Sequence, residues 1–317
     1  MTADDRDDPS PPGASTGRVA CLVLAHGDAP QVLRLRSALA PMPVLLHCDA
    51  RTDPAVFAAM TEGLEPSAVV TPRQVCEWAG FGLVEAELAG YRRFLETTEA
   101  GHLVVLSGAD YPLHPAAAVA DWIVGTGGRS VAELWPLPFP AWGRSGGLAR
   151  LRYRHWAWRK HMLRLPVPRR IPADVSPSGA SVWKIISRAH ARAVVDLVDA
   201  RPDLVAFWRR SWCADETFVP TLLRSPISGV DWENESINEA AWWIGWDGTR
   251  QKSPPTLTAG HFDRLEAAAR GVDPERPRTV PALFARKVSS TVSGPLLDRI
   301  DAELRDPART AVPEAVR

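Results

Sequence analysis

The feature that most constrains the fold is an alternation of short apolar runs with longer amphipathic segments in the first third of the chain. The apolar runs, which have the length and composition of buried strands, lie at 19–25, 43–47, 69–70 and 102–106. The segments with helical periodicity lie at 29–39, 83–96 and from about residue 54 onward. Strands and helices that alternate through short loops form a mostly parallel sheet covered by helices on both faces. The sequence therefore predicts an α/β fold.

Polar side chains follow three of these predicted strands directly. They form the clusters His26 with Asp28, His47 with Asp49, and Ser107 with Asp110. Ligands of such sheets bind beyond the carboxyl ends of the strands, so the clusters predict a shared nucleotide cleft. Each Asp could equally cap the helix that follows its strand. The chain contains neither a G-x-G-x-x-G after the first strand nor a P-loop, which disfavours a dinucleotide dehydrogenase or a P-loop NTPase.

Composition narrows the class of protein further. The chain has 37 basic and 37 acidic residues, so no basic field predicts a nucleic-acid partner. No run of about twenty apolar residues predicts a transmembrane segment. Residues 1–17 are acidic and rich in Pro and Ser, which is typical of a disordered tail and unlike a secretory signal. The four cysteines are far apart, which argues against structural zinc and predicts buried free thiols. We therefore expect a cytoplasmic protein, either free or peripheral at the inner membrane face.

Two adjacent carboxylates, Asp215 and Glu216, stand directly before the apolar segment 217–223. Acidic residues are favoured in the first turn of a helix, so Asp215 could be an N-cap and Glu216 a first-turn residue without chemical function. A carboxylate could also serve as a general base. The preceding segment 136–177 is rich in Pro, Gly, Arg and Trp, and is predicted to be a long, partly irregular insert.

Seven short blocks, taken in order, resemble those of the core-2/I-branching glycosyltransferases, a family that also contains the peptide O-xylosyltransferases. The blocks are Leu24-Ala25-His26, His47-Cys48-Asp49, Trp78–Ala86, Leu106–Leu113, Ser178–Ser187, Asp215–Phe218 and Leu283–Lys287. The resemblance extends over about residues 19–289. It implies a GT-A-type fold with one glycosyltransferase domain at 18–289, followed by a C-terminal helix and tail at 290–317. Within the domain, 18–135 would bind the nucleotide sugar and 136–289 would supply the acceptor and catalytic residues.

The resemblance also implies a mechanism, which is an inverting transfer of GlcNAc or xylose from a UDP-sugar without a metal or other cofactor. It makes Glu216 the general base, and a partly dry pocket would raise the pKa of a Glu toward neutrality. Asp215 would then cap or orient. The resemblance makes Lys287, with Arg286 beside it, the cation that grips the diphosphate. Ser107 to Asp110 contains no D-x-D to chelate a divalent ion.

The chain departs from the family pattern at a second cation, an upstream Arg. Trp242 holds its place, and Arg250 or Lys252 is expected to substitute. The contacts that the resemblance implies for the nucleotide or donor sugar are His26, Asp49 and Asp110. Those that it implies for the acceptor are Glu133, Arg152 and Tyr153, with Trp156 lining the same cleft. Two alternatives stay open, namely a nucleotide-sugar-binding protein impaired in catalysis and a metal-dependent hydrolase that uses Asp110 and Asp215.

Overall fold

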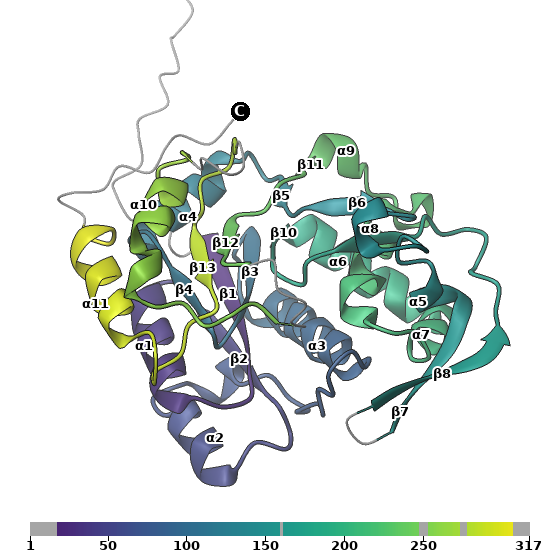
Figure 1. Cartoon of the computed structure of the whole chain (residues 1–317), viewed down its shortest axis with the longest axis horizontal. Helices are drawn as coiled ribbons and strands as arrows, with labels where there is room; N and C mark the ends of the chain where they lie inside the picture. Colours follow the sequence, from purple (N-terminus) through teal and green to yellow (C-terminus); the bar gives the residue numbers. More distant parts are fainter. Residues whose placement is uncertain (1–17, 159–160, 247–252, 273–277, 307–317) are drawn as a thin grey trace, which may run out of the picture.

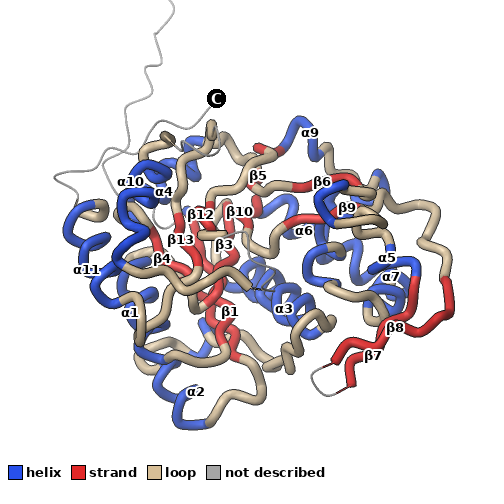
Figure 2. Tube along the Cα trace, in the orientation of Figure 1, coloured by secondary structure: helices blue, strands red, loops and turns tan. Residues whose placement is uncertain are grey.

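A six-stranded sheet forms the centre of the protein (Figures 1 and 2). The computed structural model describes residues 18–158, 161–246, 253–272 and 278–306. The strands of the central sheet, in spatial order, are β11 (Ser236–Ile237), β5 (Ser130–Val131), β10 (Lys184–Ser187), β3 (His102–Ser107), β1 (Val19–Ala25) and β2 (Val44–Cys48). Strand β1 is parallel to both β2 and β3, while β10 is antiparallel to β3 and β5. The predicted α/β class with a mostly parallel sheet is confirmed.

Three smaller sheets surround the central one. Their strands are β4 (Asp110–Pro112), β13 (Phe284–Arg286) and β12 (Trp242–Ile244) in the first, β6 (Leu134–Pro136) and β9 (Ser178–Ala180) in the second, and β7 (Tyr153–Trp158) and β8 (His161–Pro168) in the third. The first is important for function, because the antiparallel pairing of β4 with β13 aligns Asp110 with Arg286. Two motifs more than 170 residues apart in sequence thus become neighbours across one strand pair.

Helices cover both faces of the central sheet (Figure 1). The helices are α1 (Ala29–Leu39), α2 (Pro54–Thr61), α3 (Gly82–Thr97), α4 (Ala116–Gly125), α5 (Ala149–Arg152), α6 (Arg188–Ala200), α7 (Pro202–Trp208), α8 (Phe218–Arg224), α9 (Trp232–Glu235), α10 (Phe262–Ala269) and α11 (Gly294–Glu303). Alternate residues of β1 belong to different cores, because successive strand side chains point to opposite faces. Cys21 and Val23 pack with α1, α4, α10 and α11, whereas Leu22 and Leu24 pack with α3, α6 and α8.

A buried ion pair fixes β10 against α3. The ammonium of Lys184 lies 2.6 Å from a carboxylate oxygen of Glu87, and both side chains are essentially excluded from solvent. The hydroxyl of Tyr91 donates to the same carboxylate. Burying a charge is costly unless it is paired, so this triad favours one register of β10 over its alternatives. Strand β10 begins directly after Trp183, so the same ion pair also helps to position Trp183.

Three expectations about the fold need correction. Residues 69–70 form no strand, since Val69 makes only an isolated bridge to Leu46. The insert 136–177 is less irregular than expected, because it contains α5 and the β7–β8 hairpin. Helix α8 begins at Phe218, and a separate 3₁₀ turn holds Ala214–Glu216. Both of the expected functional halves, 18–135 and 136–289, contribute strands to the central sheet, and their division of roles stays a prediction.

The remaining elements agree with expectation where they are described. The C-terminal helix is α11, while the predicted tails at 1–17 and 307–317 lie outside the described residues. All four cysteines are free thiols, and Cys21 and Cys48 are buried as predicted. In the described ranges, no helix is long and apolar enough to cross a membrane.

Candidate active site

A cavity of about 590 Å³ opens at the carboxyl ends of β1, β2 and β3. Its polar lining at these strand ends includes His26, Asp49 and Ser107, one residue from each of the three predicted clusters. The lining also includes Trp183, from the turn before β10, and Arg286 at the end of β13. The three strand ends therefore share one cavity, whereas its role as a nucleotide site stays a prediction. Asp28 and Asp110 do not line it. Asp28 caps α1 by accepting from the backbone N–H of Gln31, which is the alternative that the sequence left open, and Asp110 is buried.

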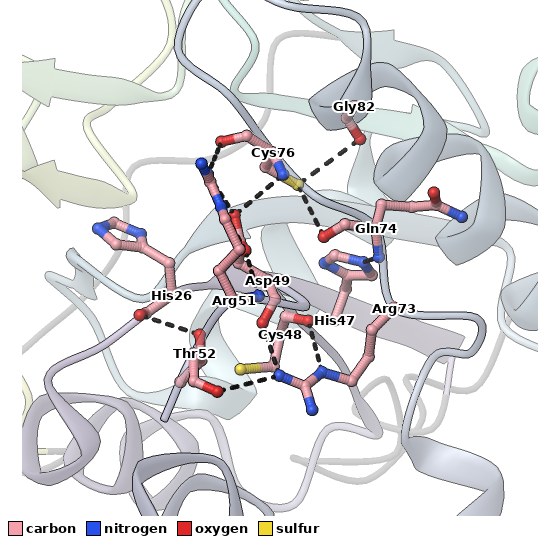
Figure 3. A network of polar contacts seen from close by, with 10 residues as sticks. All are labelled: His26, His47, Cys48, Asp49, Arg51, Thr52, Arg73, Gln74, Cys76 and Gly82. Atoms are coloured by element: carbon pink, nitrogen blue, oxygen red, sulfur yellow. Dashed lines mark hydrogen bonds and ion pairs between the residues drawn. The ribbon is translucent and has the colours of Figure 1, made fainter. Parts of the chain in front are cut away.

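The β2 end of the cavity is held by a network around Asp49 (Figure 3). The carboxylate of Asp49 accepts hydrogen bonds from the backbone N–H and guanidinium of Arg51 and from the backbone N–H of Cys76. Burial raises the pKa of Asp49, but these bonds outweigh it and the net pKa is lowered. Asp49 is therefore ionised and ties the 72–76 loop to the end of β2. Arg51 lines the cavity beside it.

The same loop is fixed by two further side chains in this network. Burial lowers the pKa of His47 to about 4, so its ring is neutral near pH 7 and its Nε2 accepts the backbone N–H of Gln74 at 2.9 Å. The guanidinium of Arg73 donates to the carbonyls of Cys48 and Asp49. His47 thus shapes one wall of the cavity without adding charge to it, while Arg73 holds the backbone behind that wall and does not line the cavity.

The wall next to Ser107 carries an ion pair between Arg286 and Asp110. Arg286 lies 2.8 Å from a carboxylate oxygen of Asp110, which has no solvent exposure, and it also contacts Ser107 Oγ. The second oxygen of Asp110 accepts the backbone N–H of Ser107 at 2.7 Å. The guanidinium stacks on Trp183, 4.2 Å from the ring centroid. These contacts fix the orientation of Arg286, whose remaining N–H groups can meet an anion in the cavity.

A strained turn places the two adjacent carboxylates in the cavity wall. Cys213 has a positive φ of 48° and donates its N–H to the carbonyl of Ala79, which itself has a φ of 60°. Such conformations are uncommon for non-glycine residues and occur often at functional sites. The turn that follows directs Asp215 and Glu216 into the cavity. Gly82, nearby, is required because a Cβ there would lie 2.0 Å from the carbonyl oxygen of Val75.

The two carboxylates differ sharply in their surroundings. Glu216 is 36% exposed and forms an ion pair with Arg150 of α5, whose guanidinium stacks on Trp142 at 3.9 Å. Asp215 Oδ1 is buried and has no hydrogen-bond partner within the described part of the protein. Burial, and next the neighbouring charge of Glu216, raise the pKa of Asp215 to about 7.

This arrangement corrects the expectation that Asp215 is an N-cap. It lies inside the 3₁₀ turn whose N-cap is Cys213, and α8 has no side-chain cap. The carboxyl group whose pKa is raised toward neutrality by burial is thus Asp215, although the sequence analysis assigned that property to Glu216.

Comparison with known proteins identifies the family. A model of the core-2/I-branching enzymes matches residues 19–266. The chain belongs to this family. That match covers most of the chain and confirms the predicted family, and a glycosyltransferase is confirmed at the level of the family.

Three curated relatives extend the comparison of this core-2/I-branching enzyme. It is 24% identical to human xylosyltransferase 2 over 307 residues, which is 90% of this chain and 34% of the relative. The chimpanzee and rat xylosyltransferases 2 are 24% identical with the same coverage. The chain spans about a third of the length of these relatives. A putative glucose-1-phosphate thymidylyltransferase from Bacillus anthracis, solved with sucrose, covers 56% of this chain and 75% of its own at 11% identity and a TM-score of 0.31.

Several residues implied by the family resemblance lie away from the cavity of this family member. Asp110 does not face the donor, because it is buried beneath Arg286 and both of its oxygens are engaged. Lys287 directly follows β13 but is not among the cavity-lining residues, whereas Arg286 is. Trp242 is buried and stacks on Phe284. The proposed substitutes for the upstream Arg, Arg250 and Lys252, lie outside the described residues.

The residues predicted to bind the acceptor are spread over the second half of the protein. Glu133 follows β5, Arg152 ends α5 and Tyr153 begins β7, and none of the three lines the main cavity. Trp156, half exposed, lines a second hollow of about 390 Å³ beside it. The two hollows share Glu77, so an acceptor that extends out of the cavity can reach β7.

Arg51, Arg150, Trp78, Trp183 and Trp246 belong to the site but were not predicted for it. Trp78 and Trp183 lie within blocks of the family, so their position was available as a signal. Arg150 carries none, because it lies in the insert and reaches Glu216 only through tertiary contacts. Across the described ranges, no group of three or more His, Cys, Asp or Glu side chains is placed to hold a metal ion.

Proposed function

We propose that this chain is an inverting glycosyltransferase that moves a sugar from a UDP-sugar, either UDP-xylose or UDP-GlcNAc, to an acceptor hydroxyl. The single observation that carries the proposal is that Glu216 and Arg286 both line one cavity at the strand ends. An inverting transfer needs a base for the hydroxyl proton and positive charge for the leaving diphosphate. The names of the curated relatives favour xylose as the sugar.

The donor would occupy the side of the cavity formed by the ends of β1 and β2. Trp78 and Trp246 line it with side chains that are 54% and 55% exposed, and their flat faces suit the stacking of a nucleobase or a sugar ring. His26 and Arg51 supply polar contacts beside them. Asp49 would hold this wall in place, because its carboxylate already accepts hydrogen bonds from Arg51 and Cys76. Arg51 would therefore contact the ribose instead of Asp49.

The diphosphate would lie against Arg286. Its guanidinium is already oriented by Asp110 and Trp183, so little side-chain entropy is lost when an anion binds. Such a preorganised cation can balance the charge that develops on the leaving group, as a metal does in other enzymes. Lys287 is proposed as a second cation at the diphosphate. Arg250 or Lys252, in place of the family's upstream Arg, is proposed as a third.

Glu216 would take the proton of the acceptor hydroxyl while its oxygen attacks the anomeric carbon and the bond to the diphosphate breaks. The ion pair with Arg150 holds the carboxylate in place before the acceptor arrives. Asp215, whose pKa of about 7 keeps it largely protonated below neutrality, can donate a hydrogen bond from the same wall. Glu133, Arg152 and Tyr153 remain proposed acceptor contacts at the outer end of this path.

Calorimetry and thermal shift of the purified chain against UDP, UDP-xylose, UDP-GlcNAc, UDP-glucose and GDP-mannose, with and without EDTA, test the proposal. A ligand that binds the native state raises apparent stability by mass action. We expect a UDP-selective shift that survives EDTA. Glu216→Gln should keep this shift and lose UDP release in the presence of acceptor. A shift that requires a divalent ion would favour the hydrolase alternative, and retained binding without any turnover of the unmodified chain would favour the impaired binder.

A further inference from the structure

The hairpin formed by β7 and β8 has one face against the protein and one face in solvent. It lies at one side of the molecule (Figure 1) and pairs with no third strand in the described ranges. On the inner face, the side chain of His155 is buried. At the edge of β7, the backbone N–H of His155 donates to the carbonyl of Arg210 at 2.8 Å. The cross-strand pairs of Trp156 with Leu163 and of Arg154 with Leu165 lie on the opposite face.

This outer face is unusually apolar for a solvent-exposed ribbon. Four large apolar side chains, each between 41% and 50% exposed, alternate along it, namely Trp156, Leu163, Leu165 and Val167. The whole described part of the protein exposes ten large apolar side chains, so four of them gather on this one face. Clustered exposed apolar groups mark an interaction surface, whereas single ones are ordinary.

The same hairpin is strongly cationic, although the chain as a whole is neutral. Within 152–158 and 161–170 there are five arginines and no acidic residue. The exposed ones are Arg152, Arg154, Arg164 and Arg170. Arg210, next to the hairpin, stacks on Trp156 at 4.4 Å. Of the exposed arginines of the hairpin, Arg154 shares the outer face with Trp156, whereas Arg164 pairs with His155 and lies over the ring of Tyr153 on the other face. Because Arg154 and Arg210 lie beside the apolar side chains, the occupant of this face must be anionic as well as able to accept apolar side chains.

The strand itself argues against a protein partner that adds a strand. Pro166 and Pro168 lie in β8 and have no N–H to donate, so the outer edge is a poor template for β-pairing. A second copy that docked face to face would also bring like charges together. Apolar and aromatic side chains flanked by arginines are the pattern of segments that lie in the interface of an anionic bilayer. We propose that this face of the β7–β8 hairpin docks the protein on an anionic lipid membrane.

Docking by the hairpin would bring the rim of the catalytic cavity to the membrane. Trp156 lines the second hollow, which shares Glu77 with the main cavity. A protein held by the outer face of β7 therefore keeps that hollow within reach of the lipid headgroups. Membrane attachment is independent of the glycosyltransferase activity, and either could fail without the other.

Co-sedimentation of the full chain with vesicles tests the proposal directly. The vesicles are phosphatidylcholine alone and phosphatidylcholine with phosphatidylglycerol. We expect sedimentation with the anionic vesicles only, and release as salt is raised, because headgroup attraction is screened. Trp fluorescence should shift to the blue on binding as Trp156 leaves water.

Two variants separate the charge from the apolar contribution. Arg154→Gln with Arg210→Gln should lower the partition coefficient about 25-fold, at about fivefold for each arginine removed. Leu163→Ser with Leu165→Ser should lower it at least tenfold by removing the inserted apolar area. The matched control, Arg270→Gln with Val272→Ser, changes an exposed arginine and an exposed valine away from the hairpin and should leave binding unchanged. Thermal melting and UDP binding check that each variant is folded.

Other outcomes would overturn the proposal. These are sedimentation with neutral vesicles to the same extent, no sedimentation with either vesicle, or hairpin variants that bind as the unmodified chain does. Binding of an acidic polymer such as polyglutamate, lost in the hairpin variants while vesicles stay unbound, would assign the surface to an acidic macromolecule. A dimer in light scattering that dissociates in Leu163→Ser with Leu165→Ser would assign it to a second copy.

Discussion

Two arginine–carboxylate pairs adjoin the cavity, Arg286 with Asp110 and Arg150 with Glu216, and they are built differently. In the first, Asp110 is fully buried and Arg286 is 15% exposed, and the pair follows from the register of two strands. In the second, Arg150 and Glu216 are 17% and 36% exposed and lie on a short helix and a 3₁₀ turn. A buried pair held by a sheet is part of the scaffold, whereas a partly exposed pair on short elements can open when a substrate arrives. Under the proposed function, Arg286 would supply a fixed charge for the donor, and the Arg150–Glu216 pair would supply a releasable charge for the acceptor.

The largest expected effect lies on the releasable side. Glu216→Gln should lower kcat by roughly 10²–10⁴ because the general base is lost, while the affinity for UDP stays unchanged. Steady-state UDP release and calorimetry measure the two quantities. The control is Glu85→Gln, which alters a half-buried Glu outside the main cavity. A Glu216→Gln variant with normal kcat would remove the functional distinction between the two pairs.

On the fixed side, Arg286→Met should reduce both stability and donor binding. It leaves Asp110 buried without its cationic partner, which costs roughly 3–5 kcal/mol of unfolding free energy. Urea denaturation measures the loss, and calorimetry with UDP measures the affinity. Arg286→Met combined with Asp110→Asn should regain most of the stability but not the affinity. Recovery of both would show that Arg286 serves the fold alone.

The carboxyl group next to the base makes a third, pH-dependent prediction. The pKa of Asp215 is raised from 3.8 to about 7 in the folded state, so folding favours its protonated form. This contribution is fully present below about pH 4 and is lost as pH rises through about 7, by a few kcal/mol at most. Asp215→Asn should therefore match the unmodified protein in unfolding free energy at pH 4 and exceed it at pH 8. Equal differences at both pH values would contradict the burial of a neutral carboxyl group.

The smallest effect is expected from the partly exposed pair of Arg150 with Glu216. Arg150→Gln should change the unfolding free energy by less than about 1 kcal/mol, since exposed ion pairs contribute little. A double-mutant cycle with Glu216→Gln measures the coupling. The same cycle on Arg286 and Asp110 should give a coupling several times larger. Equal couplings for the two pairs would end the distinction between a scaffold pair and a releasable one.

Much of the nucleotide side of the protein could be predicted from local sequence pattern. The bounds of β1 and α1 and the start of α2 follow from apolar periodicity and from Pro and Asp at the helix starts. Asp49 and His26 at the cavity were found because parallel strands bring their carboxyl ends together. The site residues in the second half were predicted less well, because the insert 136–177 shows neither the helical nor the strand periodicity of apolar residues. Arg152 and Tyr153 were chosen by likeness to the family, whereas Arg150, one turn earlier, is the residue that reaches Glu216.

The sequence by itself determined the class of fold, the family and the position of the two adjacent carboxylates, because these depend on period, composition and short motifs. Only the tertiary structure decided which carboxylate is dry and which cation faces the cavity. The pairing of β4 with β13 directs Arg286 into the cavity and buries Asp110 beneath it. The turn at Cys213 buries Asp215 and leaves Glu216 within reach of Arg150. Burial and charge pairing arise between segments far apart in the chain, and no local pattern encodes them.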